Sequence, residues 1–581
     1  MVGFLQTTLG ILHANLMAPV VPERNRRALP DKGNIKMPTI TIDGKEITVE
    51  KGKTIIQAAD QAGIDIPRYC YHEGLPIVGQ CRICLVEVEK APKLQVACYC
   101  PVNDGMVVHT KNEKVKKARQ EVLEFLLINH PIDCPVCDQA GECFLQEYYM
   151  KHGLYDSKML EDKNKKNKAV DVGPHIVLDS ERCILCTRCV RFCDTVTKTH
   201  ELGIFNRGDH AELRPMDGKT LDNPYAANVV DICPVGALTE KDFRFKTRVW
   251  YLDETESICT GCSTGCNISI HTNKKRTYKN DERRIARLKP RYNGEVNQHW
   301  MCDVGRYGFQ HVDADSRIAQ PELTPGGEAT QQVSWQAAID KTAGILLECI
   351  NQKKSVGIIA SPQMTNESLF VTRKFASESL DCTVFPISVR PREKQFSDDF
   401  LIREDKNPNS KGAELLGFDV DHKVTDSFLD SCAHSKIDTL IVFEHDLANG
   451  YEQEFVEKAL GKVKNIIFIG SNRNATSALA SVVLPAATWA EMDGTFTNHA
   501  GLVQHAKKAL EPLGESRPSW MIVRNIARKL EVAMPYFETS DVFDDMARKC
   551  AEFEGLSFEQ LAGSTGAGTN GVMKSESTLA E

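Results

Sequence analysis

The sequence predicts a multidomain protein whose N-terminal half is α+β and whose C-terminal half is α/β. Two observations support this fold class. Of the 21 cysteines in 581 residues, 17 lie between Cys70 and Cys302, in closely spaced sets that are typical of iron–sulfur ligands. In the C-terminal half, short strand-like runs alternate with helical stretches, which is the pattern of a parallel sheet with crossover helices.

Composition argues against two classes of function. Hydrophobic residues make up 42% of the chain and charged residues 26%, as in ordinary globular proteins. The net charge of −8 gives no basic surface for nucleic acid. No run of about 18 apolar residues is present, so we expect no membrane-spanning helix.

The first 36 residues are expected to be an extension, because MPTITIDG at Met37 has the character of a domain start. Residues 1–22 are mildly apolar, but they lack a basic beginning and polar residues interrupt them, which argues against a signal peptide. The C-x2-C pairs therefore indicate metal binding in a reducing compartment rather than the disulfides of a secreted protein.

The first domain begins with a predicted β-hairpin. Residues 38–50 alternate in polarity around Asp43-Gly44, and Thr54–Ala62 then predicts a short helix. The cysteines that follow are spaced C-x10-C-x2-C-x13-C and predict a [2Fe-2S] site with the ligands Cys70, Cys81, Cys84 and Cys98.

This first site leaves two alternatives open. Cys100 competes with Cys98 for the last ligand position. Four thiolates would also suit zinc, which prefers the same tetrahedral sulfur environment. The spacing differs from the C-x4-C-x2-C of plant-type ferredoxins by a longer first loop.

A second set contains only three cysteines, Cys134, Cys137 and Cys143, after a helical stretch at Val115–Asn129. Three thiolates leave a [4Fe-4S] cluster one ligand short, and His130 is close enough in sequence to supply a ring nitrogen. Taken alone, a histidine before a proline more often marks a helix end. Beside an incomplete cysteine set we expect His130 to be the fourth ligand, and a neutral imidazole would raise the reduction potential.

The segments YCYHEGLPIVGQCRICLVEVE and NHPIDCPVCDQAGECFLQE resemble the family of the large iron–sulfur subunit of respiratory complex I, NADH-quinone oxidoreductase. The resemblance implies a β-grasp [2Fe-2S] ferredoxin domain and a helical [4Fe-4S] domain with one histidine and three cysteine ligands. It favours Cys98 over Cys100, because ACYCPV is similar to the family pattern A-C-x-x-P-V. Iron-only hydrogenases, hydrogenase diaphorase subunits and some NAD-linked formate dehydrogenases contain the same two modules, so these motifs do not select the enzyme.

A third set, C-x2-C-x2-C-x3-C, is half of a two-cluster ferredoxin, in which the fourth cysteine of each run binds the other cluster. A second run ends at Cys233, but its earlier positions are Asn223, Ala226 and Val229, so that cluster has lost three ligands. The predicted [4Fe-4S] ligands are Cys183, Cys186, Cys189 and Cys233, which leaves Cys193 as an unligated thiol. DICPVGALTE resembles the complex I family, whereas hydrogenases keep both clusters.

A fourth set, C-x2-C-x3-C-x35-C, predicts another [4Fe-4S] site with the ligands Cys259, Cys262, Cys266 and Cys302. ICTGCSTGCNISI and NQHWMCDVGRYGF resemble the start of molybdopterin oxidoreductases and those bacterial complex I chains that retain this site. Mitochondrial-type chains are expected to lack it. The resemblance implies a cluster off the main electron path, and a structural role for it stays open.

The C-terminal strands are predicted at Ser355–Ala360, Asp438–Phe443, Asn465–Gly470 and Ser481–Leu484, with helices at Ser334–Asn351 and Glu452–Leu460 among others. SWQAAIDKTAGIL and GESRPSW resemble the molybdopterin oxidoreductase superfamily. A molybdenum enzyme would need a metal-binding Cys, Ser or selenocysteine, and Cys382 has the character of a buried strand start. The region is also short for a pterin-binding body, so we expect a degenerate remnant without molybdopterin. No G-x-G-x-x-G follows a strand, so no NAD site is expected.

The charged segment Asp156–Lys168 is predicted to be a solvated linker, and Gly563–Ser577 a disordered tail. The predicted organisation is an extension (1–36), a [2Fe-2S] ferredoxin-type domain (37–115), a [4Fe-4S] domain with mixed histidine and cysteine ligands (116–155), a ferredoxin-like [4Fe-4S] domain (171–250), a molybdopterin-oxidoreductase-type [4Fe-4S] domain (251–310), a truncated α/β molybdopterin-oxidoreductase-like domain (311–535) and a tail (536–581).

The resemblance implies an electron-transfer subunit of bacterial complex I with one [2Fe-2S] and three [4Fe-4S] clusters. Its partners would be the NADH-binding flavoprotein and the downstream iron–sulfur subunits, peripherally on the cytoplasmic side of the plasma membrane. No catalytic residue, NAD or flavin is expected in this chain. The alternatives are a formate dehydrogenase or hydrogenase subunit. A hydrogenase tail should hold clustered cysteines, but only Cys349, Cys382, Cys432 and Cys550 occur there, well apart. A diaphorase subunit would usually end soon after the ferredoxin domain.

Overall fold

The computed structural model describes residues 37–153, 156–324, 329–380, 384–386, 395–448, 451–564 and 567–568. They form two compact units: a smaller one with residues up to Ile66 and Val86–Lys111, and a larger one with Pro67–Leu85 and the described residues from Asn112 onward. The predicted extension, Cys382 and most of the predicted disordered segment Gly563–Ser577 lie outside the described residues.

The smaller unit is built on a five-stranded sheet in the order β2-β1-β5-β3-β4. Its strands are β1 (Thr39–Ile42), β2 (Lys45–Thr48), β3 (Leu85–Val88), β4 (Gln95–Val96) and β5 (Met106–His109). The predicted hairpin is confirmed, since β1 and β2 pair antiparallel on either side of Asp43-Gly44. The predicted helix is α1 (Ile55–Gln61), at whose start the Gln57 side chain accepts the Thr54 backbone N–H at 2.9 Å.

The larger unit begins with two helices, α2 (Glu113–Leu127) and α3 (Phe144–His152). The Asn112 side chain caps α2 by accepting a backbone N–H of its first turn. Residues 156–168 form neither helix nor strand, as the predicted linker requires. Lys163 of this segment donates to the terminal carbonyls of Leu127 and Ile128, so the linker also caps the far end of α2.

The ferredoxin-like region contains two short helices between small sheets. Its elements are β6 (Val170–Asp171), β7 (Ile176–Leu178), α4 (Arg188–Thr195), β8 (Leu202–Phe205), β9 (Glu212–Pro215), α5 (Asn228–Ile232) and β10 (Leu238–Glu240). Phe192 of α4 and Val229 of α5 are fully buried in one apolar cluster with Leu238. This packing brings Cys189 of α4 beside Cys233, which directly follows α5.

The next region is a three-stranded antiparallel sheet of β11 (Asp253–Ile258), β12 (Asn267–Thr272) and β13 (Ile285–Pro290), followed by α6 (Asp303–Tyr307). The central strand β12 is buried along its whole length. Because β11 and β12 pair antiparallel, the backbone N–H of Cys259 donates to the carbonyl of Cys266 at 2.8 Å, and these two cysteines lie at the same end of the sheet.

The C-terminal part confirms the predicted parallel sheet. Its seven strands run in the order β15-β14-β20-β19-β18-β16-β17 and comprise β14 (Glu322–Leu323), β15 (Gln331–Gln332), β16 (Val356–Ala360), β17 (Val384–Pro386), β18 (Thr439–Phe443), β19 (Asn465–Gly470) and β20 (Val482–Pro485). The four predicted strands correspond to β16, β18, β19 and β20, and they pair in parallel.

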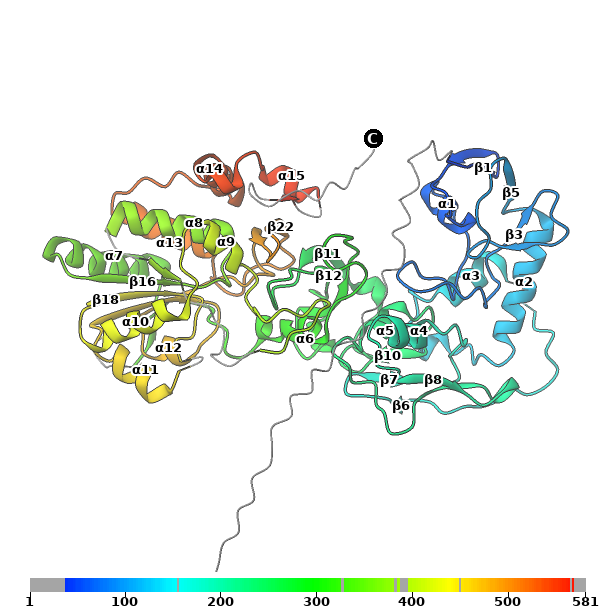
Figure 1. Ribbon diagram of the computed structural model, residues 1–581. Helices are drawn as coiled ribbons and strands as arrows, with labels where there is room; N and C mark the ends of the chain where they lie inside the picture. Colours follow the sequence, from blue (N-terminus) through cyan, green and yellow to red (C-terminus); the bar gives the residue numbers. More distant parts are fainter. Residues whose placement is uncertain are drawn as a thin grey trace, which may run out of the picture. The chain divides into compact units, whose positions relative to one another are not determined.

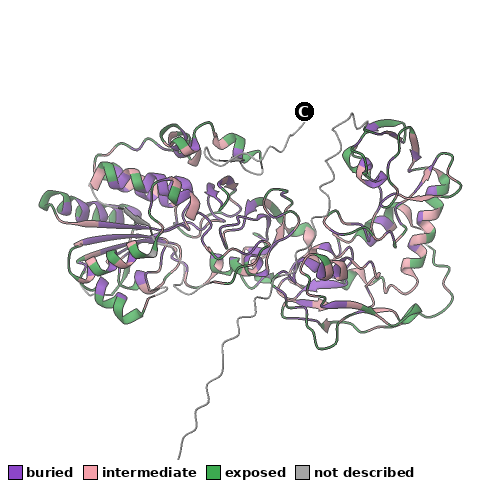
Figure 2. Cartoon of the chain, viewed as in Figure 1, coloured by how far each residue is buried: buried purple, intermediate pink, exposed green. Residues whose placement is uncertain are grey.

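Helices cover both faces of this sheet (Figure 1). The helices of this part are α7 (Trp335–Gln352), α8 (Asn366–Phe375), α9 (Ser410–Leu415), α10 (His422–Ala433), α11 (Gln453–Leu460), α12 (Ala475–Ala478), α13 (Ser519–Lys529), α14 (Thr539–Lys549) and α15 (Phe558–Ala562). Alternate strand residues belong to different apolar clusters: Ile358 packs with α7, α8 and α13, and Ile359 packs with α10 and α11. Figure 2 shows these strands buried and the outer helix faces exposed.

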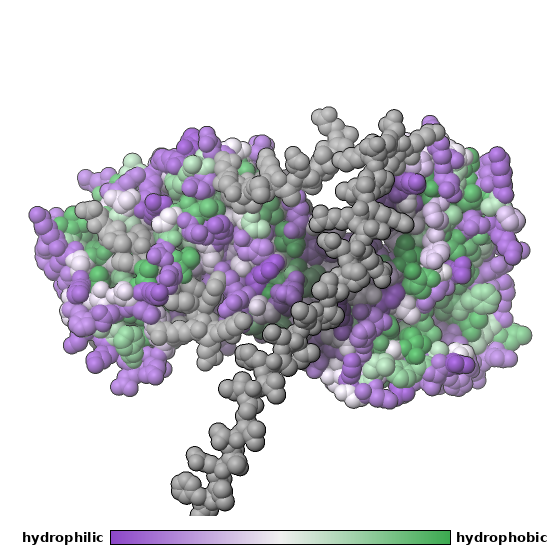
Figure 3. Space-filling view, viewed as in Figure 1, coloured by the Kyte–Doolittle hydropathy of each residue, from purple (hydrophilic) through white to green (hydrophobic). Residues whose placement is uncertain are grey.

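A smaller sheet of β21 (Gly494–Thr497), β22 (Leu502–Ala506) and β23 (Ala567–Gly568) completes this part. On the described surface, apolar side chains are interspersed with polar ones (Figure 3). Among the described residues, none of the helices combines the length and apolar character that a membrane span requires.

Candidate iron–sulfur sites

The third predicted site has the most complete geometry. One small cavity is lined by four cysteines, Cys183, Cys186, Cys189 and Cys233, together with apolar side chains that include Leu213, Val235 and Leu238. Cys193 does not line this cavity, although it lies one turn further along α4. The structure therefore brings together the four predicted ligands and separates the predicted unligated thiol from them.

Backbone N–H groups point at the sulfurs of this site. Burial raises the pKa of the Cys233 thiol, and the N–H groups of Val235, Leu238 and Ala237 act in the opposite direction because they stabilise a thiolate. The backbone N–H of Leu185 likewise donates to the Cys183 sulfur at 3.4 Å. Such donors stabilise an anionic metal–thiolate centre.

The loop that carries Cys183 and Cys186 has strained backbone, which includes the donor Leu185. Leu185 and Thr187, on either side of Cys186, have φ values of 54° and 60°. Side-chain-bearing residues rarely adopt this left-handed region. Here it turns successive N–H groups toward one side of the loop, which is the geometry of an anion-binding nest.

The second predicted site lies on the loop between α2 and α3. Cys134 begins a single 3-10 turn, η1 (Cys134–Val136), and Cys143 is the N-cap of α3. Nδ1 of His130 accepts the backbone N–H of Ile132 at 3.1 Å, which leaves Nε2 for another partner. Burial lowers the pKa of His130 to about 4, so the ring is neutral near pH 7 and able to bind a metal.

The second and third sites adjoin one another. The backbone N–H at Phe144, directly after Cys143, donates to the carbonyl of Pro234, directly after Cys233, at 2.9 Å. A Cβ atom at Gly236 would overlap the Cys137 sulfur. Gly236 thus permits the close approach of the two ligand loops.

The first predicted site has three of its cysteines in the loop 67–85 of the larger unit. Within this loop the backbone N–H of Cys70 lies 3.5 Å from the Cys81 sulfur, and Cys84 is fully buried. Arg82, between Cys81 and Cys84, has a φ of 61°. This arrangement repeats the left-handed residue found between the cysteines of the third site.

The remaining candidates for the first site, Cys98 and Cys100, follow β4 in the smaller unit. Cys98 is fully buried, whereas Cys100 is partly exposed and its thiol lies 3.8 Å from the carbonyl oxygen of the adjacent Pro101. Cys98 is therefore the less exposed of the two, and its assignment as the ligand stays a prediction.

The fourth predicted site lies where the β11–β12 sheet meets α6. Cys302 caps α6, and its sulfur accepts the Gly305 backbone N–H at 3.3 Å. The Gly261 backbone N–H donates to the Cys259 sulfur at 3.4 Å. A Cβ atom at Gly305 would stand 2.8 Å from that same sulfur, so this glycine keeps space between Cys259 and Cys302.

The four loops fit iron–sulfur clusters in their donor chemistry. Each presents thiols, or thiols and one imidazole, with backbone N–H groups turned toward sulfur. Among the described residues, no group of three or more His, Cys, Asp and Glu side chains converges closely enough for a single metal ion. The sequence analysis missed Gly236 and Gly305, since nothing in a sequence marks which loops pack against a given glycine.

Comparison with protein families matches five segments of the chain. They are a 2Fe-2S iron-sulfur cluster binding domain (36–113), the NADH-ubiquinone oxidoreductase-G iron-sulfur binding region (119–158), the ferredoxin-like domain of NADH-quinone oxidoreductase subunit 3 (173–239), the molybdopterin oxidoreductase Fe4S4 domain (252–314) and molybdopterin oxidoreductase (402–529).

The last match implies a molybdopterin, and its absence from this chain stays a prediction. The contacts of the residues after β16 bear on this prediction. There, the buried Glu367 of α8 accepts the backbone N–H and the hydroxyl of Thr495 at 2.9 and 2.8 Å. Asn366 donates to the hydroxyls of Thr495 and Thr497. The strand β21 thus packs against the start of α8, which follows the carboxyl end of β16, and this end of the strands is where α/β folds usually bind ligands.

Individual relatives agree with the family matches. The G subunit of NADH-quinone oxidoreductase from Rickettsia felis is 41% identical over 334 residues, which are 58% of this chain and 48% of that protein. The chain thus spans about half the length of the bacterial relatives. The mitochondrial NADH-ubiquinone oxidoreductase 78 kDa subunit of Candida albicans is 30% identical over 611 residues, covering 86% of this chain and 83% of that protein.

Among solved structures, an NAD+-reducing [NiFe]-hydrogenase in the H2-reduced state aligns with 36% of this chain and 91% of its own, with 32% identity and a TM-score of 0.34. The family follows from the length and identity of the sequence relatives. The chain belongs to the family that comprises the G subunit of NADH-quinone oxidoreductase and the mitochondrial 78 kDa subunit of NADH-ubiquinone oxidoreductase.

Proposed function

We propose that this chain is the electron-transfer iron–sulfur subunit of a bacterial NADH:quinone oxidoreductase, complex I. The observation that carries the proposal is the cavity lined by Cys183, Cys186, Cys189 and Cys233, from which Cys193 is absent. The resemblance of the sequence to complex I chains implies that a ferredoxin-like domain reduced to one cluster distinguishes them from hydrogenases. Family membership supports the same assignment.

The proposed ligands are the four sets predicted from the sequence. They are Cys70, Cys81, Cys84 and Cys98 for a [2Fe-2S] cluster, and for three [4Fe-4S] clusters His130, Cys134, Cys137 and Cys143; Cys183, Cys186, Cys189 and Cys233; and Cys259, Cys262, Cys266 and Cys302. When bound, such clusters accept and release single electrons.

The chain's own residues would hold the clusters, exclude water and set their potentials. Buried apolar side chains such as Val235 and Leu238 line the third site, and backbone N–H groups face its sulfurs. Burial and hydrogen bonds to sulfur are two of the factors that tune iron–sulfur potentials. No residue of this chain is assigned a role in hydride transfer or quinone chemistry.

Electrons would come from an NADH-oxidising flavoprotein subunit and leave through downstream iron–sulfur subunits toward quinone. The chain would then be peripheral to the membrane, on its cytoplasmic side. The contacts between β21 and α8 support a C-terminal part that binds no molybdopterin. The fourth site would lie off the main path.

Metal analysis of the anaerobically purified full chain tests this proposal, together with EPR of the reduced protein. We expect about 14 irons per chain, one [2Fe-2S] signal and several [4Fe-4S] signals. Molybdenum near one per chain would contradict the absence of molybdopterin. A colourless, folded chain that carries zinc in place of iron would overturn the function.

A further inference from the structure

Arg188 occupies a central position among three of the predicted sites. It lies on α4 between Cys186 and Cys189, and its side chain is buried, with 5% of the residue exposed. One terminal nitrogen donates to the carbonyl of Tyr71 at 2.5 Å, and the other donates to the carbonyl of Ile232 at 3.0 Å. The same guanidinium lies 5.9 Å from the ring centre of Phe144.

Each of these three neighbours adjoins a proposed ligand of a different site. Tyr71 follows Cys70 of the first site, Phe144 follows Cys143 of the second, and Ile232 precedes Cys233 of the third. Arg188 also lines the cavity of the third site. A single side chain therefore contacts three ligand loops that are far apart in the sequence. It donates hydrogen bonds to the backbone of two loops and packs on an aromatic ring of the other.

Among the described residues, no carboxylate pairs with the Arg188 guanidinium. Its contacts are with two backbone carbonyls and one aromatic ring. Its Nε atom is buried and has no hydrogen-bond partner there. A buried cation is costly unless negative charge lies close to it. The neighbouring groups that can supply negative charge are the cysteine sulfurs of the ligand loops.

We propose that Arg188 is a positioning residue shared by the first, second and third clusters, and that its charge raises all three reduction potentials. The inference rests on the proposed function. A fixed positive charge favours the reduced form of a nearby cluster, because reduction adds one negative charge. The hydrogen bonds to Tyr71 and Ile232 would at the same time fix the distance between the first and third loops.

Arg191, one turn further along α4, provides a matched comparison. Its terminal nitrogens donate to the carbonyls of Pro76 and Cys70 at 2.5 Å and of Cys186 at 3.4 Å. It thus contacts the loops of the first and third sites. None of these contacts is with the loop of the second site. Removing the Arg191 side chain should therefore leave the reduction potential of the second cluster unchanged.

The test compares Arg188→Gln, Arg188→Lys and Arg191→Gln in the full, cluster-loaded chain, by iron content and EPR-monitored redox titration. In Arg188→Gln we expect the oxidised-to-reduced ratio of three clusters to rise about tenfold at a fixed potential, about 59 mV per one-electron centre. The fourth cluster should not move. Arg188→Lys, which keeps the charge, should stay close to wild type, and Arg191→Gln should move only the first and third clusters.

Unchanged potentials in an iron-replete Arg188→Gln chain would overturn the inference, as would an equal shift of all four clusters. If Arg188→Gln fails to assemble its clusters, Arg188→Lys decides. An oxidised-to-reduced ratio that rises about tenfold at a fixed potential in a fully loaded Lys variant, which is a fall of about 59 mV, would exclude charge as the cause. A wild-type chain without iron would instead contradict the proposed function.

Discussion

At the scale of single residues, the ligand loops depend on backbone that most side chains avoid. Arg82, Ile132, Leu185 and Thr187 all have φ between 52° and 61°, and each lies within two residues of a proposed ligand. The left-handed region costs a side-chain-bearing residue about 1–2 kcal/mol. At Leu185 the backbone N–H donates to the Cys183 sulfur, and at Ile132 it donates to the His130 ring nitrogen. Strain beside proposed ligands is typical of functional sites.

The strain can be measured at Ile132, a β-branched residue with φ 52° and 53% exposure. We expect Ile132→Gly to raise the stability of the loop by about 1 kcal/mol, because glycine adopts this region without the Cβ clash and little packing is lost. Amide hydrogen exchange of residues 130–137 in the iron-loaded chain would measure this change in the stability of the loop. Val136→Gly is the matched control: Val136 is 61% exposed on the same loop without positive φ, and it should lose stability.

His130 provides a second prediction at this scale. His130→Cys should retain a [4Fe-4S] cluster at the second site but lower its reduction potential, because a thiolate adds a negative charge that a neutral imidazole lacks. Redox titration of the variant monitored by EPR would show the shift. An unchanged potential would indicate that His130 is not a ligand.

Cys193 and Cys233 form a third test. Cys193 is buried but outside the third cavity, so Cys193→Ala should keep all cluster signals and cost only about 1 kcal/mol in stability. Cys233→Ala should lose the third cluster's EPR signal and reduce the iron content by up to about four per chain. Loss of one signal in Cys193→Ala would refute the assignment of Cys193 as unligated.

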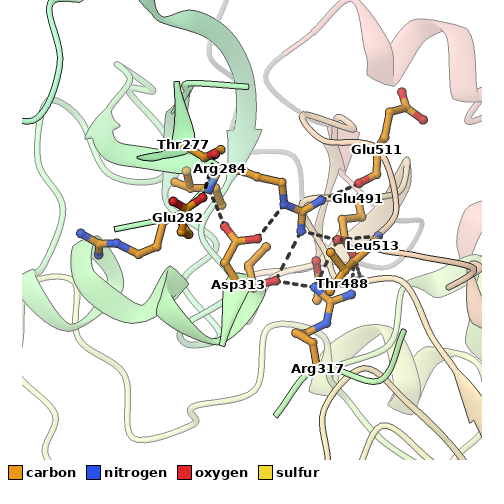
Figure 4. Close-up of polar contacts among 12 residues, drawn as sticks. Thr277, Glu282, Arg284, Asp313, Arg317, Thr488, Glu491, Glu511 and Leu513 are labelled. Atoms are coloured by element: carbon orange, nitrogen blue, oxygen red, sulfur yellow. Dashed lines mark hydrogen bonds and ion pairs between the residues drawn. The ribbon is translucent and has the colours of Figure 1, made fainter. Parts of the chain in front are cut away.

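At the scale of elements, a buried charge network ties the fourth-site region to the C-terminal sheet (Figure 4). Glu491, between β20 and β21, accepts two hydrogen bonds from Arg317 at 3.1 and 2.8 Å and one from Arg284 at 2.6 Å. Arg284, which precedes β13, also donates to Asp313 at 2.6 Å. The side chain of Glu491 is wholly inaccessible and that of Arg317 is 2% exposed.

Removing the charge of Glu491 should therefore be costly. We expect Glu491→Gln to destabilise the chain by about 3 kcal/mol, because the buried Arg317 would lose its compensating charge. Urea unfolding followed by intrinsic fluorescence would measure the loss. Glu511→Gln is the control: Glu511 is 86% exposed and pairs with Lys508, so its change should stay within about 0.5 kcal/mol. Equal effects would show that Glu491 contributes no more than a surface ion pair.

At the scale of the whole molecule, two neighbouring groups at the end of β18 act on stability in opposite directions as the pH changes. Burial raises the pKa of Glu444 to about 7, against a hydrogen bond from the Ser519 hydroxyl that lowers it. Burial lowers the pKa of the adjacent His445 to about 4, against the charge of Asp446 that raises it. Neither ring nitrogen of His445 has a hydrogen-bond partner among the described residues.

The signs of the two effects differ. Glu444 binds its proton more tightly in the folded chain, so its contribution is complete below about pH 4.5 and is lost as the pH rises to 7. His445 binds its proton less tightly when folded, so its contribution is complete above about pH 6.5 and is lost as the pH falls to 4. As the pH rises from 4.5 to 6.5, the stabilising contribution of Glu444 falls while that of His445 grows.

Glu444→Gln should separate them. Relative to wild type, we expect its stability to improve by up to about 3 kcal/mol between pH 4.5 and pH 7.5, because only the wild type loses the Glu444 contribution. Urea unfolding at several pH values would show this difference. The exposed Glu454→Gln on α11 should follow the wild-type pH profile. A constant difference between Glu444→Gln and wild type would contradict the raised pKa.

Much of this protein could be predicted from local patterns. The hairpin at Asp43-Gly44, the helix after Thr54 and four parallel strands follow from residue alternation and turn chemistry, which act over a few positions. The cysteine spacings predict which thiols belong to each proposed cluster. The absence of cysteines from positions 223, 226 and 229 predicts that Cys233 joins Cys183, Cys186 and Cys189, and the third cavity brings these four together.

The sequence by itself thus determined many of the elements and the family, and it predicted the ligand sets. Only the tertiary structure decided which loops meet. It placed Gly236 against Cys137, left Cys193 outside the third cavity, packed β21 against the start of α8, and buried Arg188 among loops that lie up to 117 residues away along the chain. The spacing of residues in the sequence determines only which groups are close along the chain. The close approach of loops and the compensation of buried charge involve distant segments, which only packing brings together.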